Sequence, residues 1–144
     1  MLTQILVGAA LVGITAIVQA GFMLAGLRLL QSLRTHERNF SHHHATLIIV
    51  TFVVSMFFAM VIDMAIWASV YRAVDAVGTF EEALFVSAGS FTTIGYGDVL
   101  IDKNWRLLVG IEGANGMIIF GWATALVVAA IQHFYDWTPE EKNR

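Results

Sequence analysis

The segment Thr92-Thr93-Ile94-Gly95-Tyr96-Gly97-Asp98, called the signature segment below, is the most informative stretch of this sequence. Held extended, such a run can aim successive backbone carbonyls, with the Thr93 hydroxyl below them, at one axis, where they replace the water shell of a dehydrated cation. Carbonyls that point the same way require φ > 0 at alternate residues, which Gly95 and Gly97 adopt at little cost. The side chains of Ile94 and Tyr96 would then point away from the ion. Because one strand supplies only part of such a cage, we expect four copies around the axis.

The composition indicates a protein of the lipid bilayer. Of its 144 residues, 58% are hydrophobic and 13% are charged, and the mean hydropathy is +0.72. This leaves too little polar surface to cover a water-soluble globule of that length. The sequence has no cysteine, which excludes disulfides and thiolate metal sites. Its net charge of −3 and the lack of a basic patch with interleaved aromatic residues argue against a nucleic-acid partner.

Three apolar segments, residues 2–27, 46–70 and 107–131, are each long enough to cross roughly 30 Å of hydrocarbon as a helix. A shorter apolar stretch, residues 81–92, runs directly into the signature segment and is too short to span. We interpret it as a re-entrant helix buried in protein, because irregular backbone is not tolerated against lipid. Thr79 can cap this helix, and the acidic pair of Glu81 and Glu82 complements the positive end of its dipole.

The order of helix, short helix, signature segment and helix over residues 46–131 resembles the two-helix pore domain of the potassium-channel superfamily, and residues 93–97 closely resemble its TVGYG filter signature. The resemblance implies an all-α integral membrane protein. Each subunit would have three transmembrane helices, a re-entrant pore helix and a selectivity-filter loop, and four subunits would form a homotetrameric channel. The chain then divides into an extra N-terminal transmembrane helix (1–30), a cytoplasmic loop (31–45), the two-helix pore domain (46–132) and a short cytoplasmic tail (133–144).

The same resemblance assigns roles to individual residues. Potassium, the permeant ion, would be coordinated by Thr93, Ile94, Gly95, Tyr96 and Gly97. Support of the filter would fall to Thr92, Asp98 and Glu112. The cavity and the gate would be formed by Gly116, Met117, Phe120 and Thr124. Gly116 could serve as a gating hinge or as a flat surface against the pore helix. No cofactor and no catalytic residue is implied, so we expect passive conduction and no enzyme activity.

Two features common in this family are missing. Many members carry a glutamate in the pore helix, six residues before the first filter glycine, which pairs with the aspartate after the filter; here that position is Gly89. Two aromatic residues that often surround the filter correspond to Phe85 and Val86, so one of them is lost. We therefore expect this filter to be braced in another way.

Two acids, Asp63 and Glu112, lie inside predicted spans, where a carboxyl group is costly unless it is paired or faces water. A protonated Glu112 could donate a hydrogen bond and partly replace the missing carboxylate pair. The expected partners are Ser90 or Thr92 for Glu112, with Asn115 or Trp122 as a purely local alternative, and Arg72 or Arg106 for Asp63.

The charges around the spans predict an orientation. Basic residues lie after the first span and in the C-terminal tail, which places both on the cytoplasmic side and the N-terminus and pore loop outside; they are Arg28, Arg34, Arg38, Lys142 and Arg144. The sequence of the third span is also similar to small bacterial ion-channel proteins with an extra leading helix. This implies the bacterial inner (plasma) membrane, with membrane lipids as surroundings.

The first span has no counterpart in the minimal two-helix pore. Small residues at four-residue spacing suit close helix contact, and we expect simple packing without a regulatory role; the pairs are Ala9 and Gly13, Ala16 and Ala20, and Gly21 and Ala25. A voltage sensor needs several regularly spaced arginines, and only Arg28 is present, at the end of the span.

Histidines gather near the expected cytoplasmic surface, at His36, His42, His43, His44 and His133. A proton or metal sensor is conceivable because histidine changes charge near neutral pH and binds transition metals. Consecutive residues of a helix point in different directions, however, so we favour a solvated helix start with Ser41 as its cap.

Two other functions are compatible with parts of this sequence. An enzyme or cofactor-binding membrane protein could use the glycine-rich segment to hold an anion, but no lysine follows the segment and Asp98 would repel phosphate. A non-selective monovalent cation channel of the same architecture is the closer alternative. The intact Gly95, Tyr96 and Gly97 favour potassium selectivity.

Overall fold

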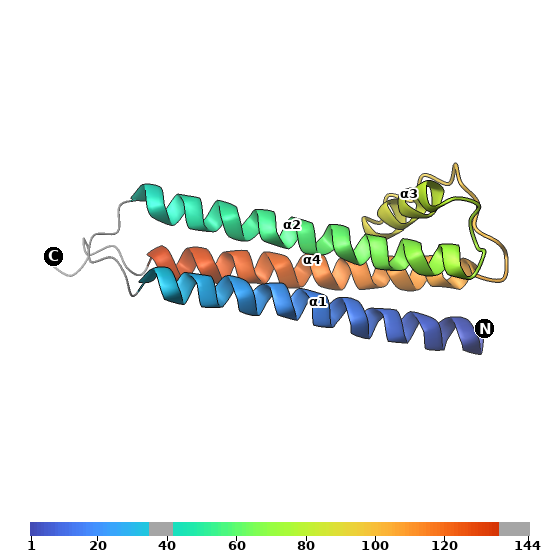
Figure 1. The fold of residues 1–144 in the computed structure, drawn as a ribbon, viewed down its shortest axis with the longest axis horizontal. Helices are drawn as coiled ribbons and strands as arrows, with labels where there is room; N and C mark the ends of the chain where they lie inside the picture. The colour runs from blue at the N-terminus through green and yellow to red at the C-terminus, as the bar shows by residue number, and fades with distance from the viewer. Residues whose placement is uncertain (35–41, 136–144) are drawn as a thin grey trace, which may run out of the picture.

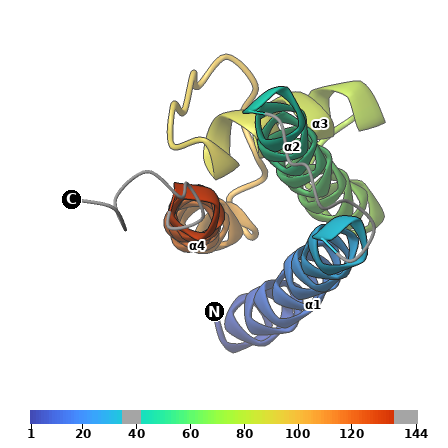
Figure 2. The ribbon, with the colours of Figure 1, turned by 90° about the vertical axis from the view of Figure 1, so that its left-hand side faces the viewer.

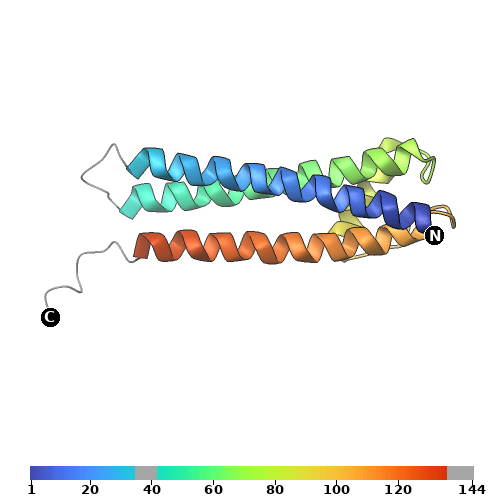
Figure 3. The same ribbon diagram turned by 90° about the horizontal axis from the view of Figure 1, so that it is seen from below.

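The computed structural model describes residues 1–34 and 42–135, which form four helices: α1 (Leu2–Arg34), α2 (His42–Ala73), α3 (Phe80–Phe91) and α4 (Arg106–Tyr135). The three long helices lie alongside one another, and the short α3 packs at one end of the bundle (Figure 1). Viewed from the other end, the three long helices form a triangle, in which α4 contacts α1 as well as α2 (Figure 2). The N-terminus lies at the same end as α3, and the last turn of α4 lies at the opposite end (Figure 3).

Three helical stretches are long and apolar enough to cross a membrane: Leu2–Gly26, Ile49–Ala73 and Arg106–Ala129. They agree with the three predicted spans to within a few residues. The helices themselves are longer than the spans, because α1 continues to Arg34 and α2 already begins at His42. Both therefore extend into residues 31–45, expected to be a loop. Residues 28–34 contain no glycine or proline that would end α1 at the edge of the apolar stretch.

All four helices contribute to a buried apolar cluster at the α3 end of the bundle, which includes Leu11, Trp67, Tyr71, Ala83 and Leu108. A smaller cluster near the middle joins Met60, Phe91, Ile119 and Ala123. Many large apolar side chains elsewhere on the helices are exposed in the single chain, as expected of helices that face lipid or other subunits. The packing thus holds α3 and the segment that follows it against α2 and α4.

The glycines that bring α1 close to its neighbours are Gly8 and Gly26. A Cβ atom at Gly8 would lie 2.8 Å from Ile111 Cδ1, and one at Gly26 would lie 2.7 Å from the Phe52 ring. At Gly13 and Gly21, in contrast, no atom of the described residues lies within 4 Å of a Cβ. The prediction that these two would lie at close helix contacts is therefore wrong within the chain. Four-residue spacing marks a face of α1, but it does not say which face meets the partner helix.

Polar side chains also tie α1 to the other two spans. The Asn115 amide Nδ2 donates to Thr15 Oγ1 at 2.9 Å, which joins α4 to α1. The Gln19 amide Nε2 donates to Asp63 Oδ2 at 3.1 Å, which joins α1 to α2. All four side chains are buried. Because water is scarce at this depth, such contacts fix which faces of the helices meet.

Candidate functional site

A capping box fixes the N-terminus of α3. The Glu82 backbone N–H donates to Thr79 Oγ1 at 3.2 Å, and the Thr79 N–H donates in return to Glu82 Oε2 at 3.0 Å. The cap predicted at Thr79 is thus confirmed, and the helix begins at Phe80. At the other end, the Thr92 hydroxyl donates to the Ala88 carbonyl at 2.6 Å. Both ends of α3 are defined by local hydrogen bonds, so the chain enters the signature segment in a fixed direction.

The backbone φ angles of residues 93–97 in the signature segment alternate between positive and negative values. Positive φ angles occur at Thr93 (62°), Gly95 (59°) and Gly97 (78°), that is, at every second residue. This confirms the prediction for the two glycines. Thr93 was not expected in this conformation, which costs a residue with a side chain about 1–2 kcal/mol. A run of alternating hand is the backbone that can turn successive carbonyls toward one side.

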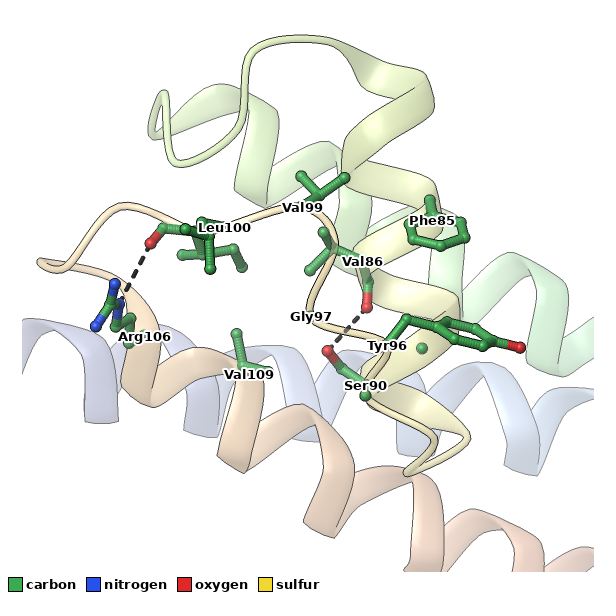
Figure 4. Close-up of a pocket in the computed structure, with 12 residues that line it drawn as sticks. Phe85, Val86, Ser90, Tyr96, Gly97, Val99, Leu100, Arg106 and Val109 are labelled. Atoms are coloured by element: carbon green, nitrogen blue, oxygen red, sulfur yellow. Dashed lines mark hydrogen bonds between the residues drawn. The ribbon is translucent and has the colours of Figure 1, made fainter.

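Two contacts hold the signature segment against α3. The Gly95 N–H donates to the Gly89 carbonyl at 3.0 Å. The Tyr96 ring stacks on Phe85, with centroids 5.5 Å apart and planes inclined by 20° (Figure 4). A Cβ atom at Gly89 would lie 3.6 Å from the Tyr96 ring, so Gly89 stands directly behind the segment. A backbone hydrogen bond and a ring stack therefore lie where the resemblance to potassium channels implied a carboxylate.

A cavity of about 280 Å³ opens between α3, the signature segment and the start of α4 (Figure 4). Its lining includes the small residues Val86 and Gly89, together with Val99 and Val109. Arg106 lies at the same cavity and donates through Nε to the Ile101 carbonyl at 3.4 Å. Since Val86 and Gly89 stand where a larger aromatic residue and a glutamate were expected, their small size leaves this space behind the segment open.

The carboxyl group of Glu112 lies behind α3 and is fully buried. Its Oε2 lies 2.5 Å from the Tyr71 hydroxyl oxygen, and its Oε1 lies 2.5 Å from the Ser87 hydroxyl oxygen, so it is hydrogen-bonded to both. The expected partners Ser90 and Thr92 were wrong, because both hydroxyls donate to carbonyls of their own helix. Sequence reasoning missed Tyr71 and Ser87. The only sign of their role in the sequence is that each places a hydroxyl group within an apolar stretch.

A local contact between Glu112 and Asn115 was the alternative, and it was also wrong. The Asn115 amide donates to Thr15 on α1 instead. The two residues lie on one helix, but Asn115 faces α1 whereas Glu112 faces α2 and α3. Position along the sequence alone therefore suggested a contact that the rotation of the helix does not allow.

The partners expected for Asp63 were wrong as well. Asp63 is fully buried and accepts from Gln19, whereas Arg72 pairs with the exposed Asp75 at 2.7 Å. Arg106 donates to a backbone carbonyl. The second oxygen of Asp63, Oδ1, has no hydrogen-bond partner in the part of the chain that the structure describes. Asp63 therefore acts in the contact between α1 and α2, away from the signature segment.

Gly116 lies at the closest approach of α4 to the C-terminal end of α3. A Cβ atom there would lie 2.0 Å from the Phe91 carbonyl oxygen, which no side chain could tolerate without movement. One turn earlier, a Cβ atom at Gly113 would lie 3.3 Å from the Ser90 carbonyl oxygen. This contact favours the flat-surface role of Gly116 over the hinge role.

The other residues expected at the cavity and gate lie on one side of α4 beyond Gly116. Met117 and Thr124 are exposed in the single chain, and Phe120 is partly so. The Phe120 ring meets Phe91 edge-on, with centroids 5.9 Å apart. These side chains are thus free to face a common axis in an assembly.

The remaining expected residues belong to the signature segment and to the histidine cluster. Ile94, Tyr96 and Asp98 are all exposed in the single chain. Of the histidine cluster, His36 and the expected cap Ser41 lie outside the described residues, as do the side chains of His42–His44 and His133. In the described ranges, no group of three or more histidine and acidic side chains could hold a metal ion.

The comparisons with known proteins agree with this geometry. A family model described as "Ion channel" matches residues 46–133, which is more than half of the chain and includes most of α2, all of α3 and the signature segment, and most of α4. No curated protein and no solved structure gave a significant match. With three helices able to span a membrane and a family match that covers the whole site, the chain belongs to this family of ion channels and is an integral membrane protein.

Proposed function

We propose that the protein is a passive, potassium-selective channel in which four signature segments surround one pore. The observation that carries this proposal is the alternation of backbone hand at Thr93, Gly95 and Gly97. Four such strands around an axis would present rings of carbonyl oxygens, which compensate a potassium ion for its lost hydration. The ions would bind at Thr93, Ile94, Gly95 and Tyr96, with Gly97 completing the run.

Selectivity for potassium over sodium follows from a complete set of carbonyl rings. A non-selective monovalent cation channel of the same architecture is the alternative, and it would require a ring to be missing or loose. Here two contacts restrain the signature segment: the hydrogen bond from the Gly95 N–H to the Gly89 carbonyl, and the stacking of the Tyr96 ring on Phe85. These restraints support a filter that keeps its rings in place.

We propose a homotetramer because one signature segment can supply only a quarter of a fourfold cage. Ile94 and Tyr96 are about 60% exposed in the single chain, and neighbouring subunits would cover them. We further propose that the N-terminus and the pore loop face outward and that the tail is cytoplasmic, in a bacterial inner membrane. The acidic residues around the pore loop would then attract cations to its mouth; those exposed are Asp75, Glu81, Glu82, Asp98 and Asp102.

The test is ion flux into liposomes that contain the purified protein. Potassium and rubidium should enter readily and sodium poorly. Tyr96→Asp removes the ring that stacks on Phe85 and places a charge behind the filter, so the preference for potassium should weaken. Tyr96→Phe keeps the ring and serves as the matched control.

Native mass measurement in mild detergent should give four subunits for the wild type and for both variants, so that a change in flux reports on the filter and not on assembly. Equal potassium and sodium uptake by the wild type would favour the non-selective alternative. A conducting dimer would contradict the fourfold cage.

A further inference from the structure

One buried polar cluster joins three helices behind the signature segment. Tyr71 comes from α2, Ser87 from α3 and Glu112 from α4, and none of the three side chains is exposed. The cluster extends to the backbone of α2, since Ser87 Oγ lies 2.8 Å from the Met64 carbonyl oxygen as well as 2.5 Å from Glu112 Oε1. Glu112 Oε2 lies 2.5 Å from the Tyr71 hydroxyl. The α3 helix is therefore attached to both flanking spans at one level.

The number of hydrogen atoms in this cluster limits which of its groups can donate. There are three short oxygen–oxygen contacts, and each needs a hydrogen atom between its oxygens. The hydroxyls of Tyr71 and Ser87 supply two, because a hydroxyl carries a single proton. With an ionised Glu112, Ser87 could serve either the Met64 carbonyl or the carboxylate, but not both. The third hydrogen must come from Glu112 itself.

The surroundings of Glu112 point the same way. The Glu112 carboxyl contacts the hydroxyls of Tyr71 and Ser87. The ion pair found among the described residues lies elsewhere and joins Arg72 to Asp75. In the part of the chain that the structure describes, no cation contacts the Glu112 carboxyl, and an unpaired charge at membrane depth is costly. A neutral carboxylic acid can instead take part in three satisfied hydrogen bonds.

We propose that Glu112 is held as a neutral carboxylic acid that completes a hydrogen-bonded chain across three helices. The Tyr71 hydroxyl donates to Glu112 Oε2, the carboxyl O–H at Oε1 donates to Ser87 Oγ, and the Ser87 hydroxyl donates to the Met64 carbonyl. Every oxygen–oxygen contact then has its own hydrogen, and no charge is buried. Tyr71, Ser87 and Glu112 are positioning residues, since none of them reaches the signature segment directly.

The effect reaches the signature segment through α3. Ser87 lies two residues before Gly89, whose carbonyl holds the Gly95 N–H. Fixing α3 at Ser87 therefore fixes the acceptor on which the segment rests. This part of the proposal depends on the proposed function, because it assigns to the cluster the support of a potassium filter.

Glu112→Gln is the decisive variant. The glutamine side chain has one oxygen that can accept from Tyr71 and one amide that can donate to Ser87, which is the hydrogen-bond pattern of a neutral glutamic acid. Glu112→Leu is the matched variant of similar size without hydrogen-bonding groups. Tyr71→Phe removes one hydrogen bond and keeps the buried ring.

We expect Glu112→Gln to keep the thermal midpoint and the potassium-to-sodium permeability ratio of the wild type. Glu112→Leu leaves two buried hydroxyls without their partner and should lower the midpoint by about 5 °C or more, and lower the ratio. Tyr71→Phe should lie between them. If Glu112→Gln is as unstable as Glu112→Leu, the side chain is needed as a carboxylate and the proposal is wrong.

An infrared difference spectrum between wild type and Glu112→Gln at neutral pH tests the proton without reference to ion flow. The proposal predicts the C=O band of a protonated carboxylic acid in the wild type. A pair of carboxylate bands would overturn it. Should the wild type prove non-selective while this spectrum shows the acid band, the proposed function fails and the assignment of the proton stands.

Discussion

Replacing Gly116 with alanine tests whether α4 packs against the end of α3 or bends at this residue. The added Cβ would lie 2.0 Å from the Phe91 carbonyl oxygen and 2.8 Å from the Phe91 carbonyl carbon. Ordinary contact begins near 3.4 Å, so the two helices must separate by about 1.4 Å, the difference between these distances. The obstacle is backbone, which cannot rotate away as a side chain can.

The cost of the clash at Gly116→Ala is partly offset by the higher helix propensity of alanine. Overpacking of this kind costs about 1–3 kcal/mol, and the upper end applies because the clash is with backbone. Alanine gains about 1 kcal/mol over glycine within a helix. Gly116→Ala should therefore lower the free energy of unfolding by about 2 kcal/mol. Gly121→Ala on the same helix is the control, since nothing in the described ranges 1–34 and 42–135 lies within 4 Å of its Cβ, and it should be neutral or stabilising.

Thermal unfolding of the purified protein in detergent is the assay, combined with single-channel recording. We expect the midpoint of Gly116→Ala to fall several degrees below that of Gly121→Ala, with altered conduction because the end of α3 has moved. Equal midpoints for the two variants would refute the packing argument. A changed open probability in a variant of unchanged stability would favour the hinge role instead.

Two further predictions concern buried and capping hydrogen bonds. Gln19→Leu leaves the Asp63 carboxyl without its donor and should cost about 1–3 kcal/mol of stability in the same unfolding assay, most of which the double variant Gln19→Leu/Asp63→Leu should recover; a double variant no better than the single one would contradict the pairing. Thr79→Ala removes the cap of α3 and should cost about 1 kcal/mol, whereas Thr79→Ser retains the hydroxyl and should not; equal midpoints would show that the cap is dispensable.

The features predicted correctly from the sequence are those set by local chemistry. The three apolar spans follow from composition over about 20 residues, and the start of α3 follows from the capping pattern at Thr79 and Glu82. Positive φ angles at Gly95 and Gly97 follow from the carbonyl geometry proposed for the segment. In each case, the residues that determine the structure are close together in the sequence.

The errors concern contacts between distant parts of the chain. Glu112 meets Tyr71 and Ser87, which are 41 and 25 residues away, and Asp63 meets Gln19, which is 44 residues away. Such pairs depend on how each helix is rotated about its axis. That rotation was hard to predict here because apolar residues are spread around every long helix, so no broad polar stripe marks the face that points away from the packed interior.

The reversal potential of the purified protein in a planar bilayer, with potassium chloride on one side and sodium chloride on the other, tests the central claim most directly. If four signature segments form rings of carbonyl oxygens, the current should reverse at a strongly shifted potential that corresponds to high permeability for potassium and low permeability for sodium. A reversal potential near zero would mean that the two ions pass equally well. In that case, the alternating backbone at Thr93, Gly95 and Gly97 would not form a potassium filter.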